Sequence, residues 1–216
     1  MDAVVFDMGG VILEWDPVTL YERVLGLDRA QAHALVDEID LYAWNARLDA
    51  GERIAVVLPH WQQVHPHRRR EIAWLHDRWP ASVVRIHHET VALIERVRAT
   101  GVVVAGLTNA SDEHMPHARR LAPVLDRLDP LVVSGAEGVA KPDPEIYRRL
   151  LARLDAPAQR TVLVDDRADN CAAAVAQGME AVQFADAAQA ATALVELGVL
   201  PSQPAAPGGR ETSRAS

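Results

Sequence analysis

The sequence predicts an α/β fold in three layers, with a parallel sheet between two layers of helices and a second, helical unit inserted into the chain. Short apolar segments rich in β-branched residues alternate with longer segments of helical periodicity. This alternation is typical of parallel strands joined by right-handed helical crossovers. Residues 15–85 interrupt the alternation and contain no convincing strand, which indicates the insertion.

Five segments are the expected strands of a Rossmann-like sheet. Each is short, apolar and bounded by Gly, Asp or Pro, as strands buried on both faces are. In chain order they are Ala3–Phe6, Val102–Leu107, Leu131–Val133, Thr161–Val164 and Ala181–Phe184. A chain of 216 residues with 49% apolar content is long enough to bury such a core together with a small accessory unit.

Helices are expected between these strands, because capping residues and helix-ending glycines stand at suitable positions. Gly101 ends the first of them, whose apolar face includes Val91, Ile94 and Val97. The expected starts of three later helices are Asp143 with Pro144, Asp169, and Asp186, and Gly178 ends the second of these.

The insertion is predicted to be a helical cap. It contains all five tryptophans, with helix starts indicated at Asp16-Pro17 and Asp28 and a turn at Asp49-Ala50-Gly51. The expected organisation is a core of residues 1–14 and 86–200, a cap of residues 15–85, and a tail of residues 201–216. The tail is rich in Pro, Gly, Ser and Ala without apolar periodicity, so we expect it to be disordered.

Composition excludes several classes of partner. The formal charge of -8 provides no basic field for nucleic acid or an anionic membrane. No segment reaches the roughly 18 apolar residues of a spanning helix, and the N-terminus lacks the features of a signal peptide. Cys171 is the single cysteine, so no internal disulfide forms. We therefore expect a cytoplasmic protein with a small-molecule substrate, and the oligomeric state stays open.

Carboxylates follow two of the expected strands at their carboxyl ends. Asp7 comes directly after the first strand, and Asp165 and Asp166 follow the fourth. In open α/β sheets ligands bind beyond this edge, where the ends of neighbouring strands meet. Carboxylates held close together repel one another and need a cation, and a site of hard oxygen ligands suits Mg²⁺.

Other polar residues are expected at the same edge. Thr108 and Asn109 follow the second strand, and Lys141 adds a positive charge before a Pro turn. Asp7 leads into the turn of Gly9 and Gly10, whose missing side chains allow a ligand to approach the backbone closely. The combination of acids, a lysine and a glycine turn indicates a phosphate site.

In their order along the chain, these four motifs resemble those of the haloacid dehalogenase-like hydrolases, in the branch with a small helical cap after the first strand. The resemblance covers Ala3 to about Leu200. It implies that Asp7 is a nucleophile that forms an aspartyl phosphate. It also implies that Thr108, with Asn109 beside it, binds the phosphoryl group and that Lys141 is a catalytic and phosphate-binding residue. The implied Mg²⁺ ligands are Asp7, Asp165, Asp166 and the Gly9 carbonyl, and Asp166 is the better candidate for direct ligation.

One position departs from the family pattern. Phosphatases that the chain resembles carry a second Asp two residues after the nucleophile, as general acid and base, where this chain has Gly9. Losing general acid–base catalysis costs about 10²- to 10⁴-fold in rate. Either the substrate has a good leaving group, as an anomeric sugar, acyl or aryl phosphate does, or Glu14 or Asp16 substitutes, or turnover is weak.

A rival interpretation is hydrolytic dehalogenation of a 2-haloacid by the same Asp7, without a metal. Dehalogenases of this family carry Ser and Asn where this chain has Asp165 and Asp166, and an Arg soon after the nucleophile, whereas the nearest arginine here is Arg23. A second rival is a catalytically weak binding protein on the same fold. The acidic pair favours a Mg²⁺-dependent phosphatase of a small phosphorylated metabolite.

Residues beside the motifs have open roles. His114 and His117 follow Asn109 and are therefore nearer the predicted site than the other histidines, but contact with the substrate is the less favoured of their roles. Arg167 and Asn170 follow the acidic pair and are expected either to order the surroundings of the metal or to cap the next helix.

Overall fold

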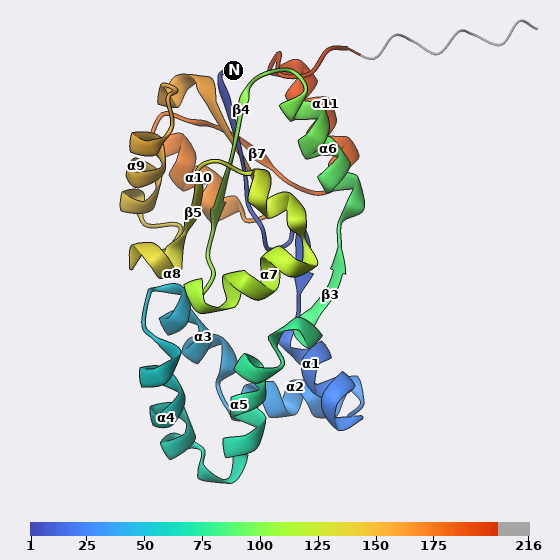
Figure 1. Ribbon diagram of the computed structural model, residues 1–216, viewed down its shortest axis with the longest axis vertical. Coiled ribbons are helices and arrows are strands. Elements are labelled where there is room, and N and C mark those ends of the chain that lie inside the picture. Colours follow the sequence, from blue (N-terminus) through green and yellow to red (C-terminus); the bar gives the residue numbers. More distant parts are fainter. Residues whose placement is uncertain (203–216) are drawn as a thin grey trace, which may run out of the picture.

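The sheet at the centre of the molecule is fully parallel and has five strands. The structure is a computed structural model that describes residues 1–202, so nearly all of the expected tail lies outside the described residues. The strand order is β5-β4-β1-β6-β7 (Figure 1). Their bounds are β1 Ala3–Phe6, β4 Val103–Thr108, β5 Leu131–Val133, β6 Thr161–Asp165 and β7 Glu180–Gln183. All five predicted strands are confirmed, with ends displaced by one residue in β4, β6 and β7.

The register of β1 brings the carboxyl ends of three strands together. Phe6 pairs with Gly106 of β4 on one side and with Val164 of β6 on the other. Because all three strands run in the same direction, the residues that follow them emerge at one edge of the sheet. Asp7 and Asp165 therefore lie side by side at that edge.

Helices cover both faces of the sheet because successive side chains of β1 point to opposite sides. Val4 and Phe6 pack in one cluster with α6 (His88–Arg98), α7 (Met115–Leu121) and α11 (Ala187–Glu196). Ala3 and Val5 pack in the other, with α9 (Pro144–Arg153) and α10 (Ala168–Ala176). Each buried valine contributes about 1.5–3 kcal/mol. The three-layer α/β prediction is confirmed.

The helix ends follow the predicted signals with one exception. The Asp143 side chain accepts the Glu145 N–H at 2.8 Å, and Asp186 caps α11 in the same way. Asp169 is not an N-cap, because the N-cap of α10 is Arg167, two residues earlier. Arg167 donates its N–H to Asp165 Oδ1 at 2.9 Å, so α10 begins at Ala168 and the Asp169 carboxylate pairs with the Arg167 side chain.

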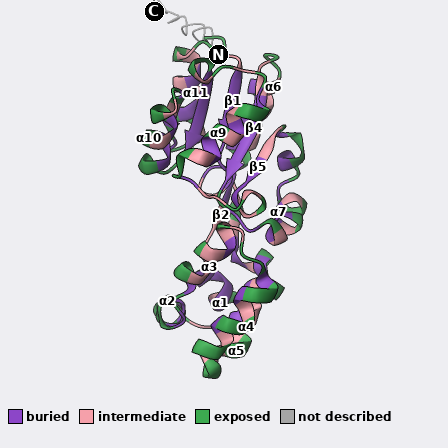
Figure 2. Ribbon diagram, turned by 90° about the vertical axis from the view of Figure 1, so that its left-hand side faces the viewer, coloured by how far each residue is buried: buried purple, intermediate pink, exposed green. Residues whose placement is uncertain are grey.

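Five helices of the insertion pack around a hydrophobic cluster of their own. They are α1 Pro17–Leu25, α2 Arg29–Glu38, α3 Leu41–Asp49, α4 Ile54–Val64 and α5 Arg69–Asp77. Asp16 and Asp28 cap the first two helices as predicted. Trp61 is buried in this cluster and donates its indole N–H to the Ile39 carbonyl at 2.7 Å. In Figure 2 the strands of the sheet are buried, whereas the insertion exposes the outer surfaces of its helices.

A two-stranded antiparallel ribbon, β2 (Leu13–Trp15) and β3 (Val83–Ile86), joins the insertion to the sheet unit. The prediction that residues 15–85 hold no strand is therefore wrong for Trp15, the last residue of β2, and for the start of β3. This strand is short and partly exposed, and its partner is about 70 residues away, so no local hairpin signal marks it. The ribbon crosses both expected unit boundaries, and the division at 14/15 and 85/86 stays a proposal.

Short helical elements complete the described part. They are α8 Ser134–Glu137 and the 3₁₀ segments Pro66–Arg68, Trp79–Ser82, Asp112–His114, Pro123–Arg127 and Ala158–Arg160. Among residues 1–202, no helix has the length and apolar character needed to cross a membrane.

Candidate active site

Three carboxyl groups meet at the carboxyl edge of the sheet, as the motif spacing predicts. Asp7 follows β1, Asp165 ends β6, and Asp166 is the next residue. Each offers an oxygen atom, and these oxygens all lie within 4.8 Å of one another. Asp7 and Asp165 are buried, whereas Asp166 is exposed. Such a cluster is stable only with positive charge beside it.

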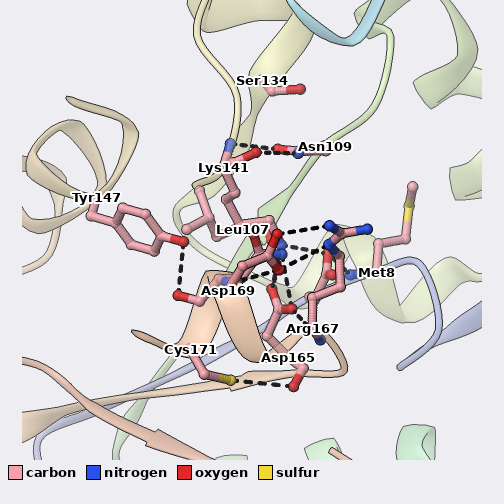
Figure 3. A network of polar contacts seen from close by, with 12 residues as sticks. Met8, Leu107, Asn109, Ser134, Lys141, Tyr147, Asp165, Arg167, Asp169 and Cys171 are labelled. Atoms are coloured by element: carbon pink, nitrogen blue, oxygen red, sulfur yellow. Dashed lines mark hydrogen bonds and ion pairs between the residues drawn. The ribbon is translucent and has the colours of Figure 1, made fainter. Parts of the chain in front are cut away.

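Lys141 supplies one such charge from the loop before α9. Its ammonium group lies 2.9 Å from Asp7 Oδ1 and 2.6 Å from Asp165 Oδ2, and it donates to the Leu107 carbonyl at 2.9 Å (Figure 3). These acceptors satisfy all three of its protons. Burial disfavours the charge of Lys141, but the two carboxylates outweigh burial and raise its pKa. Lys141 is therefore a fixed cation.

Asn109 fixes the main chain of Lys141. Its Nδ2 donates to the Lys141 carbonyl and its Oδ1 accepts the Lys141 N–H, both at 2.8 Å (Figure 3). Sequence reasoning placed Asn109 among the phosphate-binding residues, but its amide group is committed to the loop. Thr108 is only 1% exposed at the end of β4 and is not among the residues that line the cavity described below.

The two glycines after Asp7 are not equivalent. Gly10 has a φ of +72°, and a Cβ there would lie 2.5 Å from Asp166 Oδ2. A Cβ at Gly9 would meet no atom within 4 Å. The turn therefore requires glycine at Gly10, where φ is positive and Asp166 approaches the backbone, whereas nothing steric requires it at Gly9.

The two acids of the last motif have different surroundings. Asp165 accepts hydrogen bonds from Asn170 Nδ2 at 2.9 and 3.1 Å, from the Arg167 N–H, and from Lys141. Its oxygens are thus engaged by protein donors. Asp166 has no such set of partners in the described chain, and it faces the Gly9-Gly10 turn. Direct ligation therefore suits Asp166, and Asp165 orients Lys141 and Asn170.

The donor set fits a hard divalent cation. Carboxylate oxygens gather around a single lysine, and burial together with the Asp165 charge raises the pKa of Asp7, although Lys141 opposes this. The buried Oδ1 of Asn170 has no hydrogen-bond partner among the described residues, although Asn170 lines the same cavity. Excess negative charge and an unpaired buried oxygen are both features that a hydrated Mg²⁺ would relieve.

A cavity of about 520 Å³ opens above the carboxylates, and residues of both the sheet unit and the insertion line it. Its lining is Asp7, Gly9, Gly10, Trp15, Asp49, Asn109, Lys141, Asp166, Arg167 and Asn170. A smaller cavity of about 110 Å³ shares part of this lining and continues toward Trp79 and His114.

Sequence reasoning identified Asp49 only as part of a turn. In the structure it ends α3, is partly buried and lines both cavities. Burial raises the pKa of Asp49 to about 7. No local signal separates this acid from others that precede a Gly turn, because its position depends on how the insertion packs against the sheet unit.

Glu14 and Asp16, the substitutes considered for the missing acid, are committed elsewhere. Glu14 lies on the partly exposed ribbon and pairs with Arg85 at 2.8 Å. Asp16 caps α1 and pairs with Arg29 at 2.7 Å. Burial acts to raise the pKa of Asp16, but these contacts outweigh burial and lower that pKa. Neither acid lines the two cavities that contain Gly9, although Glu14 lines another cavity, of about 680 Å³, together with Gly10 and Arg85.

His114 and His117 differ in their access to the site. His114 is buried, lines the smaller cavity and stacks on Trp79 with 5.5 Å between ring centroids. Burial lowers the pKa of His114 to about 3, so its ring is neutral near pH 7. His117 lines neither cavity.

Comparison with known proteins supports the family resemblance. Residues 1–178 match the family model of the haloacid dehalogenase-like hydrolases. The chain is 27% identical over 188 residues to sesquiterpene phosphatase astK of Aspergillus oryzae, covering 85% of this chain and 90% of that protein. It is 34% identical over 92 residues to acyl-CoA dehydrogenase family member 10 of Mus musculus, covering 42% of this chain and 8% of that protein.

Solved structures share the fold. A HAD family enzyme of Bacteroides thetaiotaomicron, in complex with magnesium and inorganic phosphate, superposes with a TM-score of 0.67 at 21% identity, covering 86% of this chain and 95% of that one. The L-2-haloacid dehalogenase of Xanthobacter autotrophicus superposes with a TM-score of 0.61 at 16% identity, covering 84% and 76%. At these identities the likeness establishes the fold alone.

Proposed function

The chain belongs to the haloacid dehalogenase-like hydrolases, and from that premise we propose that it is a Mg²⁺-dependent phosphatase of a small phosphorylated metabolite. The observation that carries the proposal is the carboxylate cluster around Lys141 at the floor of the cavity. Asp7 is the proposed nucleophile, and the intermediate is an aspartyl phosphate.

Charge explains why this site suits a phosphate ester. A phosphomonoester dianion repels an approaching carboxylate, so positive charge must surround its oxygens before Asp7 attacks. Lys141, 2.9 Å from Asp7, is a permanent cation at that point. When bound by Asp7, Asp166 and the Gly9 carbonyl, Mg²⁺ supplies the further positive charge that a phosphoryl group requires.

Hydrogen bonds fix the orientation of the proposed nucleophile. Asp7 Oδ1 accepts from Lys141 and from the Met8 N–H, the latter at 2.6 Å. These two bonds hold the carboxylate in one rotamer at the cavity floor. Attack on phosphorus releases the alcohol and leaves phosphate on Asp7, and water then hydrolyses the acyl phosphate, so one difficult displacement becomes two easier ones.

The cavities and one relative bear on the substrate. The larger cavity of about 520 Å³ lies within the roughly 300–1,000 Å³ of typical ligand pockets, which suits a small-molecule phosphate ester. The similarity to a sesquiterpene phosphatase supports phosphate-ester hydrolysis. Sugar phosphates with good leaving groups are therefore the first candidates, and terpenyl phosphates are a necessary comparison.

Dehalogenation is the competing activity. It requires a cation for the substrate carboxylate, but Arg23 donates to the Ala81 and Val83 carbonyls, at 3.0 and 2.8 Å, at the base of the insertion. Of the described residues that line the larger cavity, the arginine is Arg167, which pairs with Asp169 at 2.7 Å. The carboxylate of Asp166 would also repel the carboxylate of a 2-haloacid, because dehalogenation uses no metal ion that could offset the two negative charges.

A substrate screen tests the proposal. Sugar, acyl, aryl and terpenyl phosphates are assayed with Mg²⁺ and with EDTA, beside 2-chloropropionate. We expect phosphate release that EDTA abolishes and Mg²⁺ restores, with a phosphoenzyme trapped by rapid acid quench. Halide release that persists in EDTA would establish the dehalogenase instead. Release of neither product would indicate a binding protein.

A further inference from the structure

We propose that Asp49, carried by the insertion, is the general acid and base of the reaction and takes the place of the carboxyl group absent at Gly9. The inference rests on the proposed phosphatase function and adds a catalytic residue to it. Geometry carries it: Asp49 and Gly9 lie on the walls of the same two cavities.

Only a few of the described residues line both cavities. Four residues line both of them: Gly9, Trp15, Asp49 and Asn109. Among these four, Asp49 alone has an acid side chain. A side chain at Gly9 would enter open space, since a Cβ at this position would have no neighbouring atom within 4 Å. Asp49 thus lines the same cavity space as Gly9, where an acid of the family pattern would stand.

Close contacts hold the α3–α4 turn against the sheet unit. Gly51 has a φ of +97°, and a Cβ there would lie 2.8 Å from Gly138 Cα, so the two backbones touch. The Ile54 N–H at the start of α4 donates to Glu113 Oε2 at 2.7 Å, and Arg53 pairs with Glu113 at 3.2 Å. Asp49, two residues before Gly51, is therefore held in place over the site.

The surroundings of Asp49 favour a protonated acid that can also ionise. Burial raises its pKa to about 7, while the Ser111 backbone and the Asn45 side chain, 2.9 Å from Oδ2, partly stabilise the anion. In the described chain, Asp49 forms no ion pair within 4 Å. The other titratable or charged residues on the two cavities are Asp7, Lys141, Asp166, Arg167 and His114. A general acid works best with a pKa near the working pH.

The nearby alternatives lack this combination. Glu14 and Asp16 are engaged by arginines and do not line the larger cavity. His114 lines the smaller cavity, but with its lowered pKa it has no proton to give as an imidazolium near pH 7.

The proton balance over both steps is complete. As the Asp7 carboxylate bonds to phosphorus and the ester P–O bond breaks, protonated Asp49 gives its proton to the leaving oxygen, so the product is a neutral alcohol. Asp49 is then a carboxylate. It takes a proton from the water that attacks the aspartyl phosphate, whose P–O bond to Asp7 breaks, so free phosphate forms and Asp49 is protonated again.

A leaving-group series tests the inference. kcat/KM is measured for p-nitrophenyl, phenyl and benzyl phosphate, which rise in leaving-group basicity at similar size, in the wild type and in Asp49→Asn. We expect a loss of about 10²- to 10⁴-fold with benzyl phosphate and a far smaller loss with p-nitrophenyl phosphate, which needs no proton to leave. Glu52→Gln, an exposed acid in the same turn that pairs with Arg47, is the matched control and is expected to change neither value.

Two further measurements extend the test, and the first of them uses the wild type alone, so it does not depend on the folding of any variant. In the wild type, kcat/KM for benzyl phosphate should fall above about pH 7, as Asp49 loses its proton, without a matching fall for p-nitrophenyl phosphate. Adding Gly9→Asp to Asp49→Asn should restore the benzyl phosphate rate. An equal loss on all three esters, or no loss on any, would overturn the role of Asp49 and leave the phosphatase standing. No hydrolysis of any ester by the wild type would overturn both.

Discussion

The carboxyl edge of the sheet and the turn that ends α3 line one cavity, but they differ in how their charged groups are paired. At the sheet edge, Lys141 and Asp165 are buried with every polar contact satisfied, which pins their charges in place. At the turn, Asp49 is partly buried without a cation, and an amide group holds it. The first arrangement suits permanent electrostatic stabilisation, and the second suits a group that exchanges a proton.

The difference has a structural origin. The sheet edge belongs to the most buried part of the molecule, where parallel register places the groups. The turn belongs to the insertion, and its position depends on a few contacts around Gly51 and Glu113. Changes at the sheet edge should therefore affect the fold and the chemistry together, and changes at the turn should affect mainly proton transfer.

The largest expected effect is that of Asp7→Asn. The amide keeps the shape of the side chain but is not a nucleophile, so we expect phosphate release to fall to background and no phosphoenzyme to form. Phosphate release and acid-quench trapping measure this, with circular dichroism as the control for folding. Retained turnover with a trapped intermediate would place the nucleophile elsewhere.

Lys141→Met should destabilise the fold at the carboxyl edge of the sheet. Removing the cation leaves Asp7 and Asp165 buried without compensation, so we expect the free energy of unfolding to fall by about 3–5 kcal/mol, with loss of activity. Urea unfolding measures the stability. Arg153→Ala, which removes an exposed partner of Glu137, is the control and should cause a much smaller change. Equal losses in the two variants would contradict the contrast between the regions.

The two glycines of the turn after Asp7 should respond differently to alanine. Gly10→Ala places a Cβ at positive φ against Asp166, so we expect a loss of about 1–2 kcal/mol in stability and weaker Mg²⁺ binding. Gly9→Ala should be tolerated in both respects. Thermal unfolding and Mg²⁺ titration calorimetry compare the two variants, and a similar penalty for both would show that the space at Gly9 is closed.

The smallest effect concerns the pH dependence of stability. The pKa of Asp49 is about 7 in the folded state and has an ordinary value of 3.8. Between pH 3.8 and about 7, the folded chain therefore holds a proton on Asp49 that the unfolded chain has lost. The stability from Asp49 is therefore present at low pH and is lost as the pH rises from about 4 to 7. Asp49→Asn should remove this loss and be more stable than the wild type at pH 8.

Unfolding curves from pH 4 to pH 8 measure this difference. Identical pH dependence in Asp49→Asn and the wild type would mean that Asp49 titrates as an exposed acid. The turn would then no longer contrast with the sheet edge.

The sequence alone determined the sheet and the convergence of Asp7 and Asp165 at its edge. Apolar strand patterns and parallel connections are local or short-range features, and parallel register places strand ends together whatever the details of packing. The N-caps at Asp16 and Asp143 were predictable for the same reason, since a cap contacts the main chain two or three residues away.

Only the tertiary structure decided the rest. β3 pairs with a strand about 70 residues away, Asn109 meets the Lys141 main chain across 32 residues, and Asp49 reaches the site through the contact of Gly51 with Gly138. None of these has a periodic or local signature, because each depends on how two packed units meet. Side chains at strand ends follow from the chain pattern, whereas the proposed proton donor follows from the packing of the insertion on the sheet unit.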